Sequence, residues 1–496
     1  MSLPRHALPE PEVLAGLPPV REVPAAEVAA RIRSAPRLVV LDDDPTGTQT
    51  VKDIPVLTTW TVDDLRWALR QDSTAFFVLT NTRSLAPADA ADRNREIVRA
   101  LHQASRAEGV PYAIASRSDS TLRGHFPLET DVLAEELTAQ GAPAPDGVVV
   151  VPAYIEAGRL TVDSTHWMRT PDGLLPVGES EFAKDATFGY RSSRLPDWIE
   201  EKTHGRTPAG KVLRITLTDL RVEGPSHVAT LLSTLRDGAP AVVDAVCDDD
   251  LRVLALALAE AEENGAHLLY RVGPSFVRAR AGQSAHPPLT PAELRPLRGD
   301  APHGLIVVGS HVSLTTRQLD RLREQQESQR GGKPDGQPGG PQDNLTEYEL
   351  DVAQLLDDTR RATHIREIAT AAAAALETSD AVIRTTRTLV TGTDPDTSLA
   401  ISRSVSAALV EAVRLVNAAR RPAFVIAKGG ITSSDTATHG LEIRRAWARG
   451  TLLPGIVSLW QPVDGPAAGI PYVVFAGNVG GDNALADALA LLRSAA

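Results

Sequence analysis

The sequence predicts an α/β protein of two domains, each a mostly parallel sheet flanked by helices. Short apolar, β-branched runs alternate with longer helix-like stretches along nearly the whole chain, which is the pattern of parallel sheets covered on both faces. The expected strands are too numerous for one sheet, and a stretch dense in proline, arginine and glycine separates them into two groups. The length of 496 residues also fits two or three domains.

The expected strands occupy 38–41, 75–79, 112–115, 147–151 and 241–246, and then 305–308, 381–384, 423–427 and 472–475. Helix-like stretches lie between them at 88–108, 251–264, 369–376 and 401–419. We therefore expect an N-terminal extension over 1–36, a first α/β domain over 37–295 and a second over 303–496. The second domain contains a segment rich in Gly, Pro and Gln at about 324–345, for which we expect a disordered insertion.

The bulk composition argues against several classes of function. A formal net charge of -12 disfavours nucleic-acid binding, which needs a surplus of Lys and Arg, and aromatic residues make up only 4% of the chain. No run approaches the roughly 18 apolar residues of a membrane-spanning helix, and the Pro-rich N-terminus lacks the apolar segment of a signal peptide. The single cysteine allows no internal disulfide. We expect a cytoplasmic protein whose partners are small molecules.

Three consecutive carboxylates, Asp42, Asp43 and Asp44, follow the first expected strand, and Thr46 and Gly47 lie in the turn after them. Ligands of open α/β sheets bind at the carboxyl ends of the strands. Adjacent carboxylates repel one another unless a cation, a proton or a bound polyol relieves the repulsion. The pattern indicates a ligand site, and an exposed acidic turn is the alternative.

Polar side chains follow three further strands of the first domain in the same way. They combine guanidinium groups, which bind carboxylates through two parallel hydrogen bonds, with a carboxylate and hydroxyls that bind sugar hydroxyls. This mixture suits a polyhydroxy acid, while a polar turn with an internal ion pair is the alternative. The residues are Arg83 after 75–79, Asp119, Ser120, Arg123 and Gly124 after 112–115, and Arg159 after 147–151.

The second domain carries glycine-bearing loops after three of its strands. Free backbone N–H groups in such loops, together with a helix N-terminus, favour phosphate binding. Thr432 and Asp435 also fit a capping box at the start of a helix. The P-loop pattern is absent, so a nucleotide site here is of another kind. The candidate nucleotide-binding residues are Gly429, Gly430, Ile431, Thr432 and Ser433, with Ser310 and Ser313 on a second loop and Gly477, Asn478 and Gly480 on a third.

Two other functions remain open on these patterns. Asp42, Asp44 and Thr46 match the first motif of haloacid-dehalogenase-type phosphatases, in which the first Asp is the nucleophile and the second an acid or base. The later motifs of such an enzyme would stand very far along the chain, and the glycine loops would have no role. The second rival is a non-catalytic sensor of sugar acids or nucleotides.

Taken together, the motifs resemble those of the four-carbon acid sugar kinase family. The family's Asp-Asp-x-Thr-Gly corresponds to Asp43, Asp44, Thr46 and Gly47, and its Asp-Ser-Thr-Leu-Arg-Gly is intact over 119–124. Pro152-Ala153 followed by Gly158-Arg159, and Gly429-Gly430 followed by Thr432-Ser433, match as well. The chain departs from the family in three places: Asp42 where Ala is common, Ile431 where an acid is common, and Val479 in place of Phe.

The resemblance implies that the first domain binds a sugar acid such as threonate, erythronate or a 3-oxo-tetronate, and that the second binds ATP, with the active site in the interdomain cleft. It implies transfer of the γ-phosphoryl group to the terminal hydroxyl, assisted by Mg²⁺. Asp43 or Asp44 would orient that hydroxyl and accept its proton, and the other would engage Mg²⁺. Asp119 would help to orient the substrate. The resemblance assigns no definite metal ligand, and it leaves a homodimer open.

Overall fold

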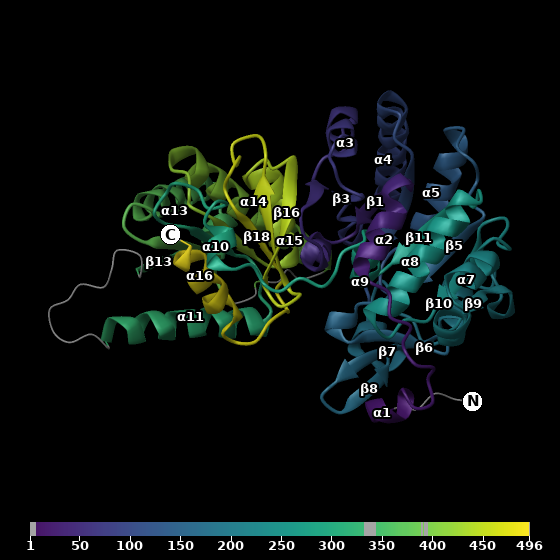
Figure 1. Cartoon of the computed structure of the whole chain (residues 1–496). Coiled ribbons are helices and arrows are strands. Elements are labelled where there is room, and N and C mark those ends of the chain that lie inside the picture. Colours follow the sequence, from purple (N-terminus) through teal and green to yellow (C-terminus); the bar gives the residue numbers. More distant parts are fainter. Residues whose placement is uncertain (1–5, 332–343, 388–389, 391–394, 496) are drawn as a thin grey trace. The chain divides into compact units, whose positions relative to one another are not determined.

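The computed structural model describes residues 6–331, 344–387, 390 and 395–495. The chain divides into two compact units, Met1–Ala285 and His286–Ala496, called here the N-terminal and C-terminal units. Each contains a mostly parallel sheet flanked by helices, which confirms the predicted fold class (Figure 1). Among the helices in the described ranges, none is both long and apolar enough to cross a membrane.

The sheet of the N-terminal unit is parallel throughout the strand pairs described. Asp42 lies level with Leu79 on one side and with Arg117 on the other, so the carboxyl ends of three neighbouring strands coincide. Loops that leave these strands therefore meet at one edge. The strand order is β2 (Ile54–Leu57), β3 (Ala75–Leu79), β1 (Arg37–Asp42), β4 (Tyr112–Arg117), β11 (Leu268–Val272), β5 (Gly147–Val151), β10 (Ala239–Val243) and β9 (Leu213–Ile215).

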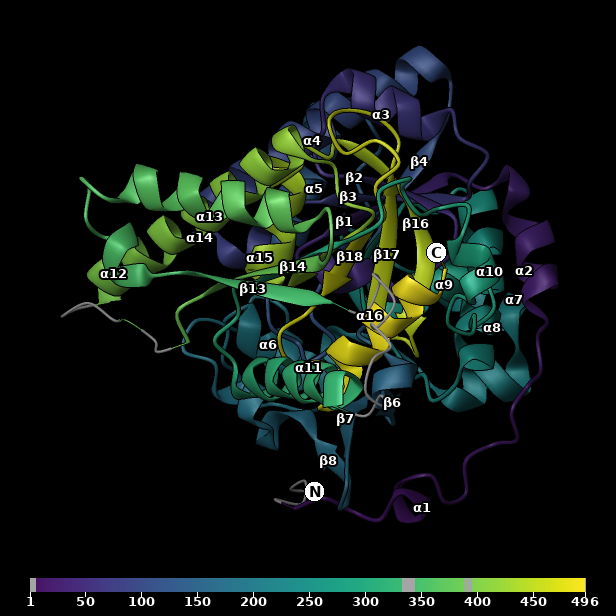
Figure 2. The same ribbon diagram turned by 90° about the vertical axis from the view of Figure 1, so that its left-hand side faces the viewer.

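Helices cover both faces of this sheet. Apolar side chains of α3, α4 and α5 pack on one face against Val39, Leu41 and Phe76. Figure 2 shows α2, α7 and α8 gathered apart from those three helices. The helices are α1 (Glu10–Val13), α2 (Ala25–Arg31), α3 (Val62–Leu69), α4 (Pro87–Glu108), α5 (Leu128–Ala139), α6 (Leu195–Lys202), α7 (Pro225–Leu232), α8 (Asp248–Glu263) and α9 (Pro274–Arg280).

A small antiparallel sheet, which the sequence analysis did not foresee, accompanies the main one. Its strands are β6 (Arg159–Val162), β7 (Thr165–Thr170) and β8 (Gly173–Pro176). Leu8 pairs with Leu174 at its edge, and α1 packs nearby. Val28 on α2 is fully buried, so the described part of the expected N-terminal extension belongs to the packed unit.

The sheet of the C-terminal unit is parallel over five strands and ends in an antiparallel ribbon. The parallel strands run in the order β13 (Leu345–Leu350), β14 (Asp380–Thr385), β12 (Leu305–Val308), β15 (Val425–Lys428) and β18 (Tyr472–Phe475). Two antiparallel strands, β17 (Val457–Pro462) and β16 (Arg445–Leu453), extend it beyond β18. The carboxyl ends of β12, β15 and β18 carry the three predicted glycine loops.

The helices of this unit again form two layers. Helices α10 (Pro291–Leu294), α11 (Ser313–Gly331) and α16 (Ala484–Ser494) contribute to the apolar core on one face of the sheet. Helices α13 (Arg361–Ala375) and α14 (Pro395–Ala419) pack against each other, as Figure 2 shows, with α12 (Val352–Leu355) and α15 (Gly430–Asp435) beside α14.

Two predicted boundaries differ from the structure. Residues 286–295, assigned to the first domain by the sequence analysis, belong to the C-terminal unit because Leu289 and Leu294 are buried in its core. The expected disordered insertion begins as helix instead, since α11 continues to Gly331 through a run of Glu, Gln and Arg residues with good helix propensity. Residues 332–343 lie outside the described ranges.

Candidate active site

A buried ion pair anchors the acidic turn of the N-terminal unit. Arg117, the last residue of β4, donates from Nη2 to Oδ1 of Asp42, the last residue of β1. Only 4% of the Arg117 side chain and 1% of the Asp42 side chain are exposed. The same Nη2 donates to the backbone carbonyl of Asp44 at 2.7 Å, so Arg117 holds both ends of the acidic turn.

Arg83 holds the other two acids of the turn. It follows β3 and donates to both oxygens of Asp43, from Nε at 3.0 Å and from Nη2 at 2.6 Å. Its Nη1 lies 3.5 Å from Oδ2 of Asp44. The Asp43 side chain is 3% exposed and the Asp44 side chain 25%. Asp44 is therefore the acid of this turn that a ligand can reach.

The environment shifts the pKa values of Asp42 and Asp44 in opposite directions. Burial raises the pKa of Asp42 to about 7, although Arg117 acts in the opposite direction. Burial would also raise the pKa of Asp44, but Arg83 and Arg117 outweigh it, and the hydrogen bonds from Thr46 to Oδ1 assist them. The pKa of Asp44 is therefore lowered, and this carboxylate is ionised at neutral pH.

Two glycines let the backbone approach these acids. A Cβ at Gly47 would overlap the Asp42 carboxylate and the Arg117 guanidinium. Gly124 has a φ of +120°, which L side chains rarely adopt, and a Cβ there would lie 3.3 Å from Oδ2 of Asp43. Both predicted substrate-binding glycines are thus required by the geometry of the acid cluster itself.

Asp119 and Arg123 form a second charged pair at this edge. Arg123 donates from Nε to Oδ2 of Asp119 at 2.7 Å, and the Thr121 hydroxyl donates to the same oxygen. Burial would raise the pKa of Asp119, but Arg83 and Arg123 outweigh it and hold this pKa well below its usual range. Ser120, next to Asp119, accepts a 2.8 Å hydrogen bond at its carbonyl oxygen from Nε2 of His166.

Arg159, like Arg117 and Arg271, has a buried guanidinium N–H with unused hydrogen-bonding capacity among the described residues. It stands at the start of β6, its Nη1 donates to the carbonyl of Ala157, and its buried Nε has no hydrogen-bond partner among the described residues. Burial lowers its pKa, and the attraction of Asp119 only partly opposes this. A bound anion would supply the missing acceptor.

The structure adds residues that the sequence analysis did not select. Arg117 comes two residues after the expected strand 112–115, and this position at a strand end was the signal that could have identified it. Arg271 on β11 gave no such signal: it is fully buried, its guanidinium lies 4.7 Å from the centre of the Trp198 ring, and Nη2 donates to the Leu122 carbonyl at 3.4 Å. Burial lowers the pKa of Arg271 to about 10. Arg271 therefore supports the 119–124 loop by its hydrogen bonds to the backbone carbonyls of Leu122 and Arg123.

In the C-terminal unit, the three glycine loops are in contact with one another. A Cβ at Gly309 would overlap Oγ1 of Thr432, and one at Gly429 would lie 2.8 Å from the same oxygen. A Cβ at Gly477 would lie 2.5 Å from Oγ of Ser310. The loops after β12, β15 and β18 therefore pack closely together, and they are called here the glycine cradle.

The start of α15 corrects one detail of the sequence prediction. The helix begins at Gly430, with Gly429 as its N-cap and no side-chain cap, so Thr432 and Asp435 do not form a capping box. Asp435 instead accepts a 2.6 Å hydrogen bond from the Ser406 hydroxyl on α14. The Ser433 hydroxyl donates to the Ala427 carbonyl and its N–H donates to the Gly429 carbonyl at 2.8 Å, while its own carbonyl accepts from the Tyr472 hydroxyl. The polar groups of Ser433 are therefore engaged within the unit.

The remaining predicted nucleotide-binding residues lie around this cradle. Ser313 begins α11, Asn478 is exposed on the loop after β18, and Gly480 has a φ of +84°. Ile431 is 60% exposed although it is large and apolar. Such exposure at the mouth of a cradle fits a surface that a ligand covers.

A pocket of about 210 Å³ adjoins the cradle. Gly309, Ile431 and Thr432 form one side of it, and Val405 and Leu409 of α14 form another. His311, Thr385, Ser402 and Ser406 add polar groups. Apolar walls with a few polar groups suit a nucleobase beside a phosphate cradle. The α14 wall was missed from the sequence because helical periodicity does not reveal what a helix faces.

Lys428 lies buried directly before the glycine turn. Its Nζ donates to the Ala476 carbonyl at 2.6 Å and lies 3.7 Å from the centre of the Phe475 ring. No carboxylate in the described ranges forms an ion pair with it. Burial accordingly lowers the pKa of Lys428 to about 7.

Comparison with protein-family models identifies the family to which this chain is related. Residues 38–280 match a model described as the sugar-binding N-terminal domain, and residues 305–485 match one described as the nucleotide-binding C-terminal domain. The chain belongs to the four-carbon acid sugar kinase family. The acidic turn 42–44 and Asp119 lie within the match to the sugar-binding domain. The glycine cradle lies within the match to the nucleotide-binding domain.

Individual relatives agree with the family. D-threonate kinase of Cupriavidus necator is 29% identical over 257 residues, which are 49% of this chain and 52% of that protein, so the chain spans about half the length of this curated relative. A solved Haemophilus influenzae structure has a TM-score of 0.59 at 18% identity, covering 92% of this chain and 100% of the other. A Salmonella typhimurium structure has a TM-score of 0.60 at 19% identity, covering 91% and 98%. These two structures show the fold.

Replacing Gly47 by Ala should destabilise this family member. The new methyl group would overlap the Asp42–Arg117 ion pair, and forcing a buried pair apart should lower the free energy of unfolding by roughly 1–3 kcal/mol. Chemical denaturation would measure the loss. Gly210→Ala is the matched control, because a Cβ at Gly210 meets no atom within 4 Å. Equal stability of the two variants would contradict the close approach.

The buried Lys428 should make stability depend on pH. Its folded pKa of about 7 lies below the unfolded value of roughly 10.4, so between these values the unfolded chain binds a proton that the folded chain lacks. Stability contributed by this group should rise with pH through that window and fall as pH drops toward 7. The free energy of unfolding of Lys428→Met should therefore exceed that of the native chain by the largest amount near pH 7 and by the smallest amount near pH 10.

Urea unfolding at several pH values between 7 and 10 would measure this difference. Lys211→Met, a change at an exposed lysine, is the matched control and should run parallel to the native chain. If the stability of Lys428→Met also changed with pH in parallel with that of the native chain, this result would contradict the buried, unpaired state of the lysine.

Proposed function

We propose that this chain is an ATP-dependent kinase that phosphorylates the terminal hydroxyl of a four-carbon sugar acid, with D-threonate as the first candidate. The observation that carries the proposal is the carboxyl edge of the N-terminal sheet, where an under-bonded guanidinium, Arg159, and an ionised, reachable carboxylate, Asp44, occur in one charged network. Family membership and the name of the Cupriavidus relative support the same class of reaction.

Arg159 and Arg123 would bind the carboxylate of the sugar acid. Arg159 has an unused buried N–H, and Arg123 is 23% exposed at its side chain beside Asp119. Asp119 and Ser120 would then bind the substrate hydroxyls, and the turns at Thr46, Gly47 and Gly124 would shape the floor of the site. Arg83, which the sequence predicts as a substrate-binding residue, would instead position Asp43, because it donates to both oxygens of that carboxylate.

Asp44 is the better candidate for the residue that orients the attacking hydroxyl and accepts its proton. The Asp43 side chain is 3% exposed, and both of its oxygens accept hydrogen bonds from Arg83. The Asp44 side chain is 25% exposed, and its Oδ2 lies 3.5 Å from Nη1 of Arg83. An ionised carboxylate within reach of a hydroxyl meets the geometric requirement for a general base.

The glycine cradle of the C-terminal unit would bind the phosphates of ATP, and the pocket beside it would bind the base. Mg²⁺ would neutralise charge on the phosphates during transfer. In the described parts of the chain, no group of three or more His, Cys, Asp or Glu side chains could hold a metal ion. This fits a Mg²⁺ ion that enters bound to the nucleotide, since such sites use one or two carboxylates together with phosphate oxygens and water.

The phosphatase alternative is less well supported by the geometry. Its nucleophile would be Asp42, which is 1% exposed, bound by Arg117 and covered by the close approach of Gly47. A nucleophile needs a free carboxylate oxygen facing the substrate. The glycine cradle would also have no function in such an enzyme.

The reaction is tested by ADP release from the purified chain with ATP, Mg²⁺ and a panel of D-threonate, L-threonate, D-erythronate and 3-oxo-tetronates. ADP should form only when an acceptor is present, and the phosphorylated acid should appear in equal amount. ADP release that is the same without any acceptor, or hydrolysis of phosphate esters without ATP, would refute the proposal.

Asp44→Asn should lower kcat by roughly 10²–10⁴-fold with the preferred acceptor, because the amide cannot accept the hydroxyl proton. ATP binding, measured by calorimetry, should stay near the native value. Asp172→Asn, at an exposed turn between β7 and β8, is the control and should retain full turnover. An unchanged kcat in Asp44→Asn would remove this residue from the reaction.

Val405→Trp should weaken ATP binding by about tenfold or more, because an indole on α14 would occupy the pocket beside the cradle. Binding of the sugar acid to the N-terminal unit should be unaffected. Ala418→Trp places the same side chain on an exposed position of the same helix and serves as the control. Calorimetric titration with ATP distinguishes the two variants, and equal affinities would place the nucleotide base elsewhere.

A further inference from the structure

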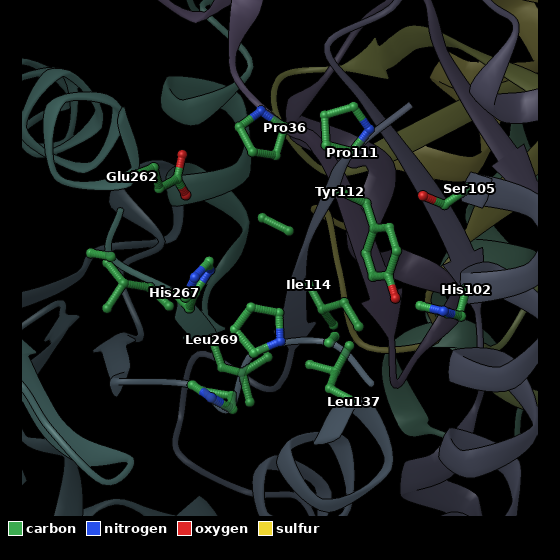
Figure 3. Close-up of a pocket in the computed structure, with 16 residues that line it drawn as sticks. Pro36, His102, Ser105, Pro111, Tyr112, Ile114, Leu137, Glu262, His267 and Leu269 are labelled. Carbon is green, nitrogen blue, oxygen red and sulfur yellow. The ribbon is translucent and has the colours of Figure 1, made fainter. Parts of the chain in front are cut away.

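A larger cavity lies in the N-terminal unit, at the amino-terminal edge of its sheet and away from the acid cluster (Figure 3). Its volume is about 400 Å³, within the roughly 300–1,000 Å³ range typical of ligand sites. The first residues of β4 and β11 form part of its wall, and their opposite ends carry Arg117 and Arg271. None of the predicted substrate- or nucleotide-binding residues lines it.

The walls of this amino-edge cavity are mostly apolar. Ile114, Leu137 and Leu269 project toward it from β4, α5 and β11 (Figure 3). Pro36 and Pro111 lie at another side, and proline offers no backbone N–H. Such a surface fits an apolar body the size of a substituted aromatic ring, and it offers few donors for the hydroxyls of a sugar.

One lining residue of the cavity has a polar group that lacks a partner among the described residues. The hydroxyl oxygen of Tyr112 is buried, and no atom in the described ranges forms a hydrogen bond with it. Figure 3 shows the Tyr112 ring beside His102 and Ser105 at the cavity wall. An unsatisfied buried hydroxyl is unfavourable, so this position calls for an acceptor from outside the chain.

No Lys or Arg side chain is among the residues that line the cavity, whose ionisable side chains other than Tyr112 are Glu262, His102 and His267. Glu262 contributes the carboxylate of the lining, but Tyr270 donates to its Oε1 and Arg280 to its Oε2, the latter at 2.6 Å. The Ser105 hydroxyl is committed to the Val110 carbonyl at 2.7 Å. A sugar acid or a nucleotide would therefore bring uncompensated negative charge to this site.

We propose that the amino-edge cavity is a second small-molecule site, which binds an uncharged compound with an apolar ring-sized body and one hydrogen-bond acceptor directed at the Tyr112 hydroxyl. The ligand class differs from both the sugar acid and the nucleotide. The site therefore stands whether or not the kinase reaction is confirmed.

Three small probes of similar size test the ligand class on the full chain. Acetophenone has an aromatic ring and a carbonyl acceptor, ethylbenzene lacks the acceptor, and benzoate carries a charge. Ligand-observed NMR should show acetophenone binding best, ethylbenzene more weakly and benzoate least. Preference for benzoate, or no binding by any of the three probes, would overturn the proposal.

Two variants locate the binding. Tyr112→Phe should weaken acetophenone roughly fivefold to tenfold and leave ethylbenzene unchanged, because only the hydroxyl is removed. Tyr348→Phe makes the same change in the C-terminal unit and should leave both probes unchanged. Ala142→Phe, which adds a ring at the cavity lining, should weaken both probes. Unchanged acetophenone affinity in Tyr112→Phe and Ala142→Phe would show binding outside the cavity and refute the assignment.

Discussion

The candidate sugar-acid site depends on one buried ion pair, between Arg117 at the end of β4 and Asp42 at the end of β1. Two charges that are 4% and 1% exposed have lost most of their hydration, and removing one partner would leave the other uncompensated. The Arg117 guanidinium also binds the Asp44 carbonyl, so it fixes the direction of the chain after β1. Gly47 is then required because no larger residue fits beside the pair.

This pair also determines how charge is shared among the three acids. Three adjacent carboxylates face two guanidiniums, those of Arg83 and Arg117, so full ionisation of all three leaves excess negative charge. Asp42 is 1% exposed, and burial raises its pKa to about 7. Asp44, nearer the surface and close to Arg83, keeps a lowered pKa. The arrangement places a stable carboxylate where a ligand can reach it.

The sequence predicted those parts of the fold and site that depend on local pattern. Apolar runs located β3, β5, β12 and β18 at their observed bounds, and the polar residues after strands marked the sheet edges where the candidate sites lie. The pairing of Arg117 with Asp42 could not be read in this way, because it depends on the register between β1 and β4. The apolar wall of α14 was hidden for a similar reason, since a helix pattern does not identify the neighbour of each face.

Short polar strands were the other source of error. Strand β7 contains threonine, histidine and arginine, and it forms only because it pairs with β6 and β8. Yet this small sheet carries His166, which bonds the Ser120 carbonyl beside Asp119. Burial lowers the pKa of His166 to about 4, so it supports that loop as a neutral ring. Part of the candidate site thus rests on tertiary pairing that no local signal reveals.

The two edges of the N-terminal sheet differ because the chain enters and leaves its strands through different kinds of segment. It leaves β1, β3 and β4 through loops rich in charged and hydroxyl side chains, which compensate one another and can admit an anion. It enters β1 and β4 from Pro36 and Pro111, whose rings line the amino-edge cavity and donate no hydrogen bond. The same parallel strands therefore present a charged surface at one end and an apolar one at the other. A charged ligand is disfavoured at the amino edge by the cost of burying an unpaired charge.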